Sequence, residues 1–597
     1  MNTNTRRCFL KNAGLILTSW FLGGCSVQGE SFRSNENTDQ PNVVLIMTDD
    51  QGWGDVHSHG NNKIDTPQMD GLAEEGARFD RFFVSPVSAP TRASLLTGRY
   101  HLRTGAHGVT GGRENVRSEE VTLAELFKSN GYKTGCFGKW HNGAHFPNHP
   151  NGQGFDEFVG FCAGHWNRYF NTKLEHNGIF FKTEGYITDV LTDFSLSFIN
   201  KNKQSPFFCY IPYNIPHAPW QVPKKYFTKY KRRDLDDKTA CAYGMCENFD
   251  DNLGRILNAL SKNGLSENTI VLFLSDNGPN SYRYNGNMKG KKGSVHEGGV
   301  RVPLFIRWPK KIQSGTIVYE NASHIDLLPT LSEMCGLSTE KCFKLDGRSL
   351  VPLLRSRNCS WQDRIIFTFP RGPEWSFQGA ARTRRWRAVK KKDKWLLFDI
   401  HSDPHEDIDV SKHYPEVLKK LSSEYTKLYK EMAEEGFKPL PISVGYPSWD
   451  EVELPAHEAT LEGEGIAYKG KNGWAHDWIA DWTSVNSFAV WDIDVVESGS
   501  FKAEVKYICS RDNTGCKIKI SAGNCAVQTE INEAFDPEPF PHRDLLPRKE
   551  VYDMPWKQVT VGTLNLSKGR QKLKVLPLAI KGREFIELKA LLLKRID

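Results

Sequence analysis

Two pairs of oxygen-bearing side chains each follow a short apolar run of the sequence. Asp49 and Asp50 come directly after one run, and Asp276 and Asn277 come directly after another. Adjacent carboxylates repel one another unless a cation lies between them. Oxygen donors without cysteine or histidine favour Ca²⁺ or Mg²⁺ over zinc. We therefore expect these four side chains to bind a divalent cation if the two runs bring them together.

A candidate nucleophile lies at the start of a predicted helix. Pro90 suits the first turn, and the apolar residues after it continue the helix until Gly98 ends it. Ser88 then lies at the helix N-terminus, where unpaired N–H groups and the helix dipole attract anions. A serine in this position either caps the helix or attacks a bound anionic group.

Four apolar runs that end in polar residues predict neighbouring strands of a buried sheet. The runs are residues 42–48, 132–138, 207–213 and 269–275. Lys139 and His141 follow the second run, and His217 follows the third. Because ligands bind outside the carboxyl ends of strands in open α/β sheets, we expect these residues to share one site with the acidic pairs.

The chain of 597 residues is too long for one hydrophobic core, and its patterning changes twice. Residues 41–368 alternate strands with helices, which predicts a catalytic α/β domain with a large mixed central sheet flanked by helices. Residues 369–450 predict a smaller α+β subdomain, a hairpin followed by a helix. Residues 451–597 have a period of two without helices, which predicts a β-sandwich.

Two features of these later regions have alternative interpretations. The sandwich is a candidate carbohydrate-binding module, because its tryptophans form either a platform for sugar rings or part of the core. They are Trp474, Trp478, Trp482 and Trp491. The basic cluster of residues 382–394 is interpreted as a solvated hairpin face rather than a contact for a polyanion.

The N-terminus resembles an export signal, with a basic start, an apolar run and small residues before Cys25. The motif RRCFLK resembles a twin-arginine signal, and LGGC resembles a lipobox. We therefore expect residues 1–24 to be removed, Cys25 to carry a lipid and residues 25–40 to form a tether. The protein would be an exported lipoprotein, periplasmic or at the cell surface, attached to the membrane only through that lipid. Ordinary signal cleavage is the alternative.

Charge and cysteine spacing limit the partners. A formal net charge of +7 is small for this length, which argues against a dedicated nucleic-acid-binding protein. Of thirteen cysteines, two lie in the signal and its lipobox, and none of the others has the CxxC spacing of a metal site. Three close pairs are either disulfides or packed thiols. They are Cys241 with Cys246, Cys335 with Cys342, and Cys509 with Cys516.

Several motifs together resemble the type I sulfatases, the formylglycine-dependent family of the alkaline-phosphatase-like superfamily. PVSAPTRASLLTG (86–98) is similar to the family signature in which Cys or Ser precedes x-Pro-x-Arg. GYKTGCFGKWH (131–141) resembles the second signature, although Phe137 is bulkier than the usual residue. KKGSVHEGGVRVP (291–303) and LFDIHSDPHEDIDV (397–410) resemble later stretches in the family order.

The resemblance implies that Ser88 is oxidised to formylglycine and that the hydrated aldehyde is the nucleophile. The serine form resembles members matured by a radical S-adenosylmethionine enzyme. One Ca²⁺ per chain would be bound by five residues. They are Asp49, Asp50, Ser88, Asp276 and Asn277.

The resemblance also assigns roles around the nucleophile. Arg92 would support the diol and the metal ligands. His141 would hydrogen-bond the diol and help to break the sulfated intermediate. Asp276 would act as base for the attack.

Three further residues would bind the sulfate group. Lys139 and Lys292 would hold its oxygens, and Lys292 is chosen among neighbouring lysines by its distance before Glu297. His217 would bind sulfate and protonate the leaving sugar oxygen.

We therefore expect a sulfatase acting on sulfated poly- or oligosaccharides. The alternatives are a phosphatase or phosphodiesterase of the same superfamily, and an inactive carbohydrate-binding lipoprotein. Candidate pocket residues are His165, Trp166, Arg168 and Arg371.

Overall fold

The structure is a computed structural model that describes residues 40–356, 359–369, 371–434 and 436–597. The predicted export signal, Cys25 and the tether up to residue 39 lie outside the described residues. Within the described ranges, no helix is long and apolar enough to cross a membrane. The eleven cysteines in these ranges are free thiols, so the three close pairs are not bridged.

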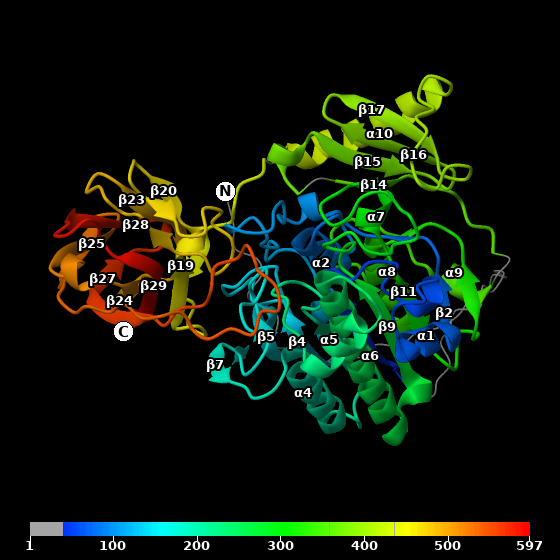
Figure 1. Ribbon diagram of the computed structural model, residues 1–597, viewed down its shortest axis with the longest axis horizontal. Coiled ribbons are helices and arrows are strands. Elements are labelled where there is room, and N and C mark those ends of the chain that lie inside the picture. The colour runs from blue at the N-terminus through cyan, green and yellow to red at the C-terminus, as the bar shows by residue number, and fades with distance from the viewer. Residues whose placement is uncertain (1–39, 357–358, 370, 435) are drawn as a thin grey trace, which may run out of the picture. The chain divides into compact units, whose positions relative to one another are not determined.

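A ten-stranded mixed sheet is the centre of the α/β region (Figure 1). Its strands, in order across the sheet, are β12 (Thr316–Val318), β2 (Ala77–Phe79), β11 (Leu304–Arg307), β9 (Thr269–Ser275), β1 (Asn42–Thr48), β8 (Phe207–Pro212), β4 (Lys133–Lys139), β5 (Glu157–Phe161), β6 (Lys173–His176) and β7 (Ile179–Lys182). The four predicted runs form the neighbouring parallel strands β9, β1, β8 and β4. Three of these, β9, β1 and β8, are buried along their whole length, as continuous apolar strands between two helical layers must be.

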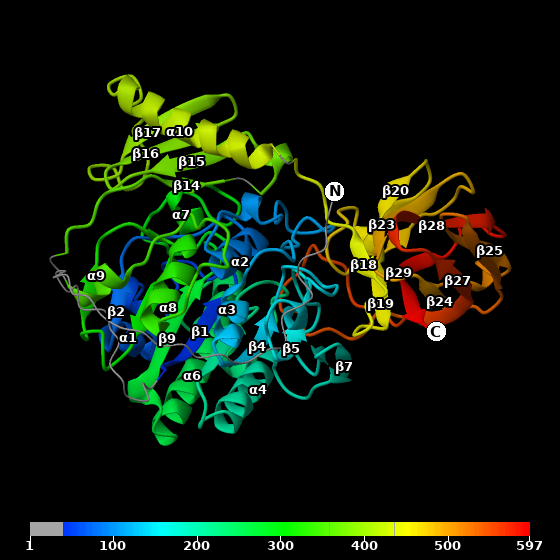
Figure 2. The same cartoon turned by 180° about the vertical axis from the view of Figure 1, so that it is seen from behind.

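Helices cover both faces of this sheet (Figures 1 and 2). Alternate side chains of β1 point to opposite faces, so Val43 and Leu45 join one core and Val44 and Ile46 join the other. The first core includes residues of α2 (Ser88–Thr97), α3 (Leu123–Ser129), α8 (Leu327–Cys335) and α9 (Val351–Arg355). The second includes residues of α1 (Pro67–Glu74), α4 (Ile187–Lys201), α5 (Lys224–Lys231) and α6 (Asp237–Lys262). This layering confirms the predicted α/β class.

A four-stranded antiparallel sheet packs against one helix beyond the central sheet. Its elements are β14 (Ile366–Thr368), β15 (Gln378–Arg382), β16 (Trp386–Lys391), β17 (Lys394–Asp399) and α10 (Pro415–Ala433). A separate three-stranded sheet comprises β10 (Arg301–Val302), β3 (Phe82–Phe83) and β13 (Ala322–Ser323).

The interpretation of the basic cluster 382–394 as a solvated face is wrong for two of its arginines. Arg382 and Arg387 are buried, and each donates to Glu297 Oε2, at 2.9 and 3.0 Å. Glu297 begins the short helix α7 (Glu297–Val300). The buried carboxylate compensates both guanidinium groups, which explains why they are not solvated.

Residues 442–595 form two packed β-sheets around a shared core. One sheet contains β18 (Ile442–Val444), β20 (Thr460–Glu462), β23 (Phe488–Val495), β25 (Cys516–Ala522), β26 (Cys525–Ile531) and β28 (Gly569–Ala579). The other contains β19 (Glu451–Pro455), β21 (Ala467–Tyr468), β22 (Ile479–Ala480), β24 (Gly499–Ile508), β27 (Lys557–Leu566) and β29 (Glu587–Arg595). We call this region the sandwich.

The tryptophans of the sandwich do not form a surface platform for sugar. Trp478, Trp482 and Trp491 are buried in the core between the sheets. Trp474 alone among the four is exposed, at 38%. The apolar area of these rings is therefore used in packing, which is the second of the two sequence interpretations.

Candidate active site

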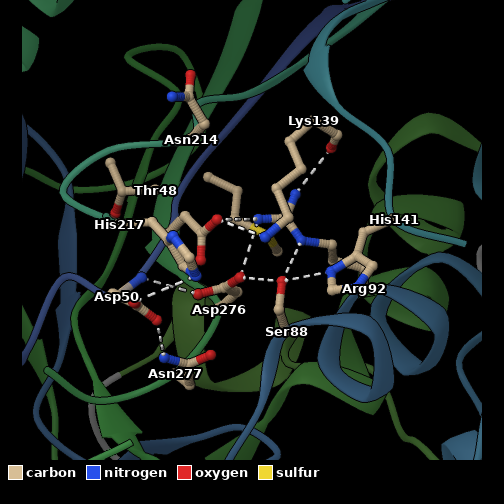
Figure 3. Close-up of polar contacts among 12 residues, drawn as sticks. Thr48, Asp50, Ser88, Arg92, Lys139, His141, Asn214, His217, Asp276 and Asn277 are labelled. Carbon is tan, nitrogen blue, oxygen red and sulfur yellow. Dashed lines mark hydrogen bonds and ion pairs between the residues drawn. The ribbon is translucent and has the colours of Figure 1, made fainter. Parts of the chain in front are cut away.

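The two acidic pairs meet at the carboxyl ends of β1 and β9. These strands pair in parallel and in register, so the residues that follow them lie side by side. The backbone N–H of Asp50 donates to Asp276 Oδ1 at 3.1 Å, and Asn277 Nδ2 donates to Asp50 Oδ1 at 2.8 Å. Asp49 and the other three side chains are buried. The predicted convergence of the four residues is thus present, and Figure 3 shows Asp50, Asp276 and Asn277 together.

The donor atoms of this cluster fit a divalent cation. Asp49 Oδ1 and Asn277 Oδ1 are buried and have no hydrogen-bond partner among the described residues. Ligand atoms of Asp49, Asp50 and His217 all lie within 4.8 Å of one another. Orphaned oxygens beside clustered carboxylates are costly without a counter-charge, and oxygen-rich sets suit Ca²⁺ or Mg²⁺. His217 therefore lies at the acidic cluster, in the shared site in which the sequence predicted it.

Ser88 is the first residue of α2, and the cap position is occupied by Val87. The Ser88 hydroxyl lies 2.6 Å from Asp276 Oδ2, to which it donates, and 3.2 Å from His141 Nδ1. It also accepts from Arg92 Nε at 2.9 Å. The capping interpretation of Ser88 is therefore wrong, because its side chain is directed to the acidic cluster (Figure 3).

The buried guanidinium of Arg92 joins the nucleophile to the acidic cluster. Its Nη2 donates to Asp276 Oδ2 at 2.9 Å, and its Nη1 donates to the carbonyl of Lys139 at 2.9 Å. Burial lowers the pKa of Arg92, but the negative charges of Asp276 and Asp49 outweigh it and leave the pKa above its usual value. Arg92 therefore carries a permanent positive charge and is hydrogen-bonded directly to Ser88.

Two lysines bind the carboxylates of the first pair. Lys139 Nζ lies 2.5 Å from Asp49 Oδ2, and Lys292 Nζ lies 2.6 Å from Asp50 Oδ1. Burial lowers the pKa of Lys139. Burial acts in the same direction on Lys292, but the charge of Asp50 outweighs it and its pKa is raised. Both ammonium groups therefore point into the acidic cluster.

The geometry distinguishes Lys292 from its neighbours, which the sequence could not do securely. Lys289 Nζ donates to the carbonyl of Glu406 at 2.5 Å. Lys291 Nζ lies over the ring of Tyr282, 4.9 Å from its centroid. Lys292 is thus the lysine of this stretch that reaches the acidic cluster.

His141 presents a free lone pair to Ser88. Its Nε2 lies 2.9 Å from the carbonyl of Val109, which can only accept, so Nε2 carries the proton in the neutral ring. Its Nδ1 then carries a lone pair 3.2 Å from the Ser88 oxygen, whose single proton goes to Asp276, so Nδ1 is free to accept from a second hydroxyl on residue 88. Burial lowers the pKa of His141 well below its usual value, so the ring is neutral.

His217 lies on the side of the acidic cluster opposite to His141 (Figure 3). Its Nδ1 donates to the carbonyl of Ala218 at 2.6 Å, and its Nε2 lies 3.8 Å from Asp50 Oδ2. Burial and the positive charge of Lys292 lower the pKa of His217 to about 4.

Arg283 and Asn214 were not among the site residues predicted from the sequence. Arg283 Nη2 donates to the backbone carbonyl of Asp50 at 2.9 Å while its guanidinium binds Asp55, which fixes the loop after β1. Asn214 is buried, and neither side-chain amide atom has a partner among the described residues. Its place directly after the predicted run 207–213, three residues before His217, is the signal that could have identified it.

The four candidate pocket residues make different contacts in the structure. His165 and His217 have nearly parallel rings with centroids 6.4 Å apart. Arg168 pairs with Asp553 at 3.3 Å, and Arg371 stacks on Trp375. His165 is therefore the candidate whose ring contact reaches the residues around Ser88.

Two family models match the chain. The model described as "Sulfatase" matches residues 41–337, and the model described as "N-sulphoglucosamine sulphohydrolase, C-terminal" matches residues 290–431. The sandwich follows these matched regions.

Named relatives agree with these matches. N-acetylgalactosamine-6-sulfatase of Mus musculus is 32% identical over 366 residues, which cover 55% of this chain and 68% of the relative. Arylsulfatase A of Homo sapiens is 31% identical over 435 residues, covering 64% and 82%. The solved structure of Ps i-CgsB in complex with k-i-k-neocarrahexaose is 34% identical with a TM-score of 0.62, covering 65% of this chain and 92% of that one. The chain therefore belongs to the type I sulfatase family of the alkaline-phosphatase-like superfamily, and it is a sulfuric ester hydrolase.

Proposed function

We propose that this sulfatase removes sulfate from sulfated oligo- or polysaccharides, with a formylglycine made from Ser88 as nucleophile and one Ca²⁺ at the acidic cluster. One observation carries the proposal: the hydroxyl of Ser88 lies within 3.2 Å of Asp276, Arg92 and His141. A relative named for an N-acetylgalactosamine sulfate and a similar structure holding a neocarrahexaose support a carbohydrate substrate.

The modification answers a chemical problem at position 88. A plain alcohol would be left as a stable sulfate ester, whereas a hydrated aldehyde has a second hydroxyl on the same carbon. One hydroxyl attacks sulfur as Asp276 takes its proton. The bond between sulfur and the sugar oxygen breaks. For His217 to protonate that oxygen through Nε2, the ring must first take a proton from solvent, which the negative charge of a bound sulfate favours, because without substrate burial and Lys292 keep the ring neutral.

Release of sulfate uses the second hydroxyl of residue 88. His141 Nδ1 takes the proton of that hydroxyl, the bond between the carbon and the sulfate oxygen breaks, and the aldehyde re-forms. Water then hydrates the aldehyde and restores the nucleophile. The neutral ring of His141, with Nε2 held by Val109, suits this step.

The remaining groups bind charge. A bound divalent cation would withdraw charge from the sulfate oxygens and the nucleophile. Asp49, Asp50, Asp276 and Asn277 would hold it, together with the oxygen of residue 88. Lys139 and Lys292 would turn to the sulfate oxygens, and donors of this kind each contribute about a hundredfold in rate.

Export and maturation form part of the proposal. Oxidation of Ser88 by a radical S-adenosylmethionine enzyme before twin-arginine export would deliver a folded, matured enzyme. A lipid on Cys25 would then attach it to the membrane in the periplasm or at the cell surface. Labelling of the chain by a radioactive fatty acid checks the anchor, and an unlabelled wild-type chain would exclude it.

The test of the proposed function is sulfate release from a panel of sulfated sugars, including N-acetylgalactosamine 6-sulfate and neocarrahexaose, by the matured chain. We expect release by the wild type and none above background by Ser88→Ala. Ser94→Ala is the matched control, because Ser94 lies on the same helix and its buried hydroxyl has no partner among the described residues. Phosphate release from phosphate esters without sulfate release would instead support the phosphatase alternative.

A further inference from the structure

We propose that the sandwich is part of the substrate site: its His476 holds His165, and His165 Nε2 binds a hydroxyl group of the sugar that carries the sulfate. This inference rests on the proposed function and adds to it a sugar-binding residue and a positioning residue. His165 lies in the segment between β5 and β6, whereas His476 lies on the sandwich loop between β21 and β22.

His165 has an unused polar atom close to the sulfate-binding residues. Its side chain belongs to a residue that is only 7% exposed, and its Nε2 is buried without a hydrogen-bond partner among the described residues. The ring is nearly parallel to that of His217, at an interplanar angle of 4°. Because an unpaired buried nitrogen costs free energy, its persistence beside the reacting groups points to a partner that arrives with the substrate.

The chemistry of this ring favours a hydroxyl group over a second sulfate. Burial lowers the pKa of His165 well below its usual value, so the imidazole is neutral. A neutral imidazole both donates and accepts hydrogen bonds, as a sugar hydroxyl does. A second sulfate bound at His165 would require a positive charge there. The positive charges of Lys139 and Lys292 lie instead at the reacting sulfate.

His476 holds the backbone of His165. Its Nε2 donates to the carbonyl of His165 at 2.9 Å, and its ring lies 5.2 Å from that of His165 and 4.8 Å from that of Trp166. Lys589 Nζ, on β29, donates in turn to the carbonyl of His476 at 2.5 Å. The φ of His476 is 68°, a left-handed conformation that a histidine rarely adopts. Such strain persists where surrounding contacts fix the residue.

Further contacts join the sandwich to the same region. Thr110 Oγ1 donates to the carbonyl of Gly473, and Thr110 follows Val109, which binds His141. Arg548 Nη1 donates to the carbonyl of Asn167 at 2.8 Å. The sandwich therefore contacts both the segment whose Val109 binds His141 and the segment that carries His165, which a separate carbohydrate-binding module would not need to do.

The test compares two substrates on the full, matured chain. The first is the sulfated sugar of the panel from which the wild type releases sulfate fastest, and the second is 4-nitrophenyl sulfate, which has no sugar. We divide kcat/KM for the sulfated sugar by kcat/KM for 4-nitrophenyl sulfate. We expect this ratio to fall about tenfold or more in His165→Ala and in His476→Ala, because only the sugar substrate loses a hydrogen bond. Asn472→Ala, an exposed change on the same loop, should leave the ratio unchanged.

A second variant separates positioning from general stability. His476→Gln retains an N–H donor at about the reach of the histidine Nε2, so it should keep the ratio within about threefold of the wild type. Equal loss on both substrates, or an unchanged ratio in His165→Ala, would overturn the inference. A wild-type chain that releases sulfate from neither substrate would instead refute the proposed function. Unfolding midpoints and the formylglycine content of each variant serve as folding controls.

Discussion

At the scale of single residues, the site is arranged before any substrate binds. Ser88 is held by a carboxylate, a guanidinium and an imidazole, all buried. Charged groups fixed in a water-poor site stabilise developing charge without reorganising during the reaction. Two oxygens of the acidic cluster, on Asp49 and Asn277, stay unpaired in this arrangement. The arrangement therefore predicts a defined effect of removing one cation ligand.

Replacing Asp50 with Asn should weaken the cation site selectively. Asp50 contributes a buried negative charge that contacts Asn277 and Lys292. We expect elemental analysis after gel filtration to find about one Ca²⁺ per wild-type chain and markedly less in Asp50→Asn, with at least a hundredfold loss of sulfate release that added Ca²⁺ partly restores. Asp393→Asn, an exposed change, should retain the wild-type content. Equal Ca²⁺ content in both variants would contradict the assigned ligands.

At the scale of elements, strand register brings the chemistry together. β1 and β9 pair in parallel from Asn42 with Thr269 to Thr48 with Ser275, so both acidic pairs leave the sheet at the same level. Contacts between distant elements then fix the surrounding layers. Glu297 of α7 is one such contact, because it binds Arg382 of β15 and Arg387 of β16.

Removing the Glu297 carboxylate should destabilise this packing strongly. Burial raises the pKa of Glu297, but Arg382 and Arg387 outweigh it and lower the pKa to about 2. We expect Glu297→Gln to reduce the free energy of unfolding by about 3–5 kcal/mol at pH 7, because the buried Arg382 loses its carboxylate partner and Arg387 keeps only Glu406. The carboxylate's contribution is present above the usual pKa and is lost as the pH falls toward 2, so the difference from wild type should shrink in acid.

Denaturant titrations at pH 7 and pH 3 measure this difference, with the exposed change Glu464→Gln as control. A pH-independent difference, or a variant as stable as wild type at pH 7, would show that the cluster is not a stabilising ion network.

Local patterns predicted the strands at the site closely. The runs 42–48 and 269–275 coincide with β1 and β9, because continuous β-branched sequence has few alternatives to a buried strand. The run 132–138 begins and ends one residue before β4, and 207–213 ends one residue after β8. Polar residues at such strand ends converge by topology, so their meeting was predictable without knowledge of any contact.

Contacts made across long stretches of sequence were not predictable. The pairing of Arg382 and Arg387 with Glu297 leaves no local pattern, so a basic hairpin suggested a solvated face. The same holds for His476 and His165, which are separated by more than 300 residues. Histidine in a loop is ordinary, and only the folded chain reveals its partner. The burial of three sandwich tryptophans likewise depends on which face of each strand meets the core.

At the scale of the whole molecule, the proposed reaction depends on one acidic cluster, the side chain at position 88 and a sandwich that contacts the segments around them. The family models match residues 41–337 and 290–431, and the sandwich adds contacts beyond these regions. Each of these parts acts on the sulfur atom only if residue 88 supplies the nucleophile. Identification of the side chain at position 88 therefore bears on all of them.

The most direct measurement is the mass of the peptide containing residue 88, taken from fully active enzyme made together with a serine-type maturase. We expect a peptide lacking two hydrogen atoms relative to the encoded sequence, in a fraction that rises in proportion to the specific activity. A peptide with intact serine in enzyme of full activity would contradict the proposed nucleophile.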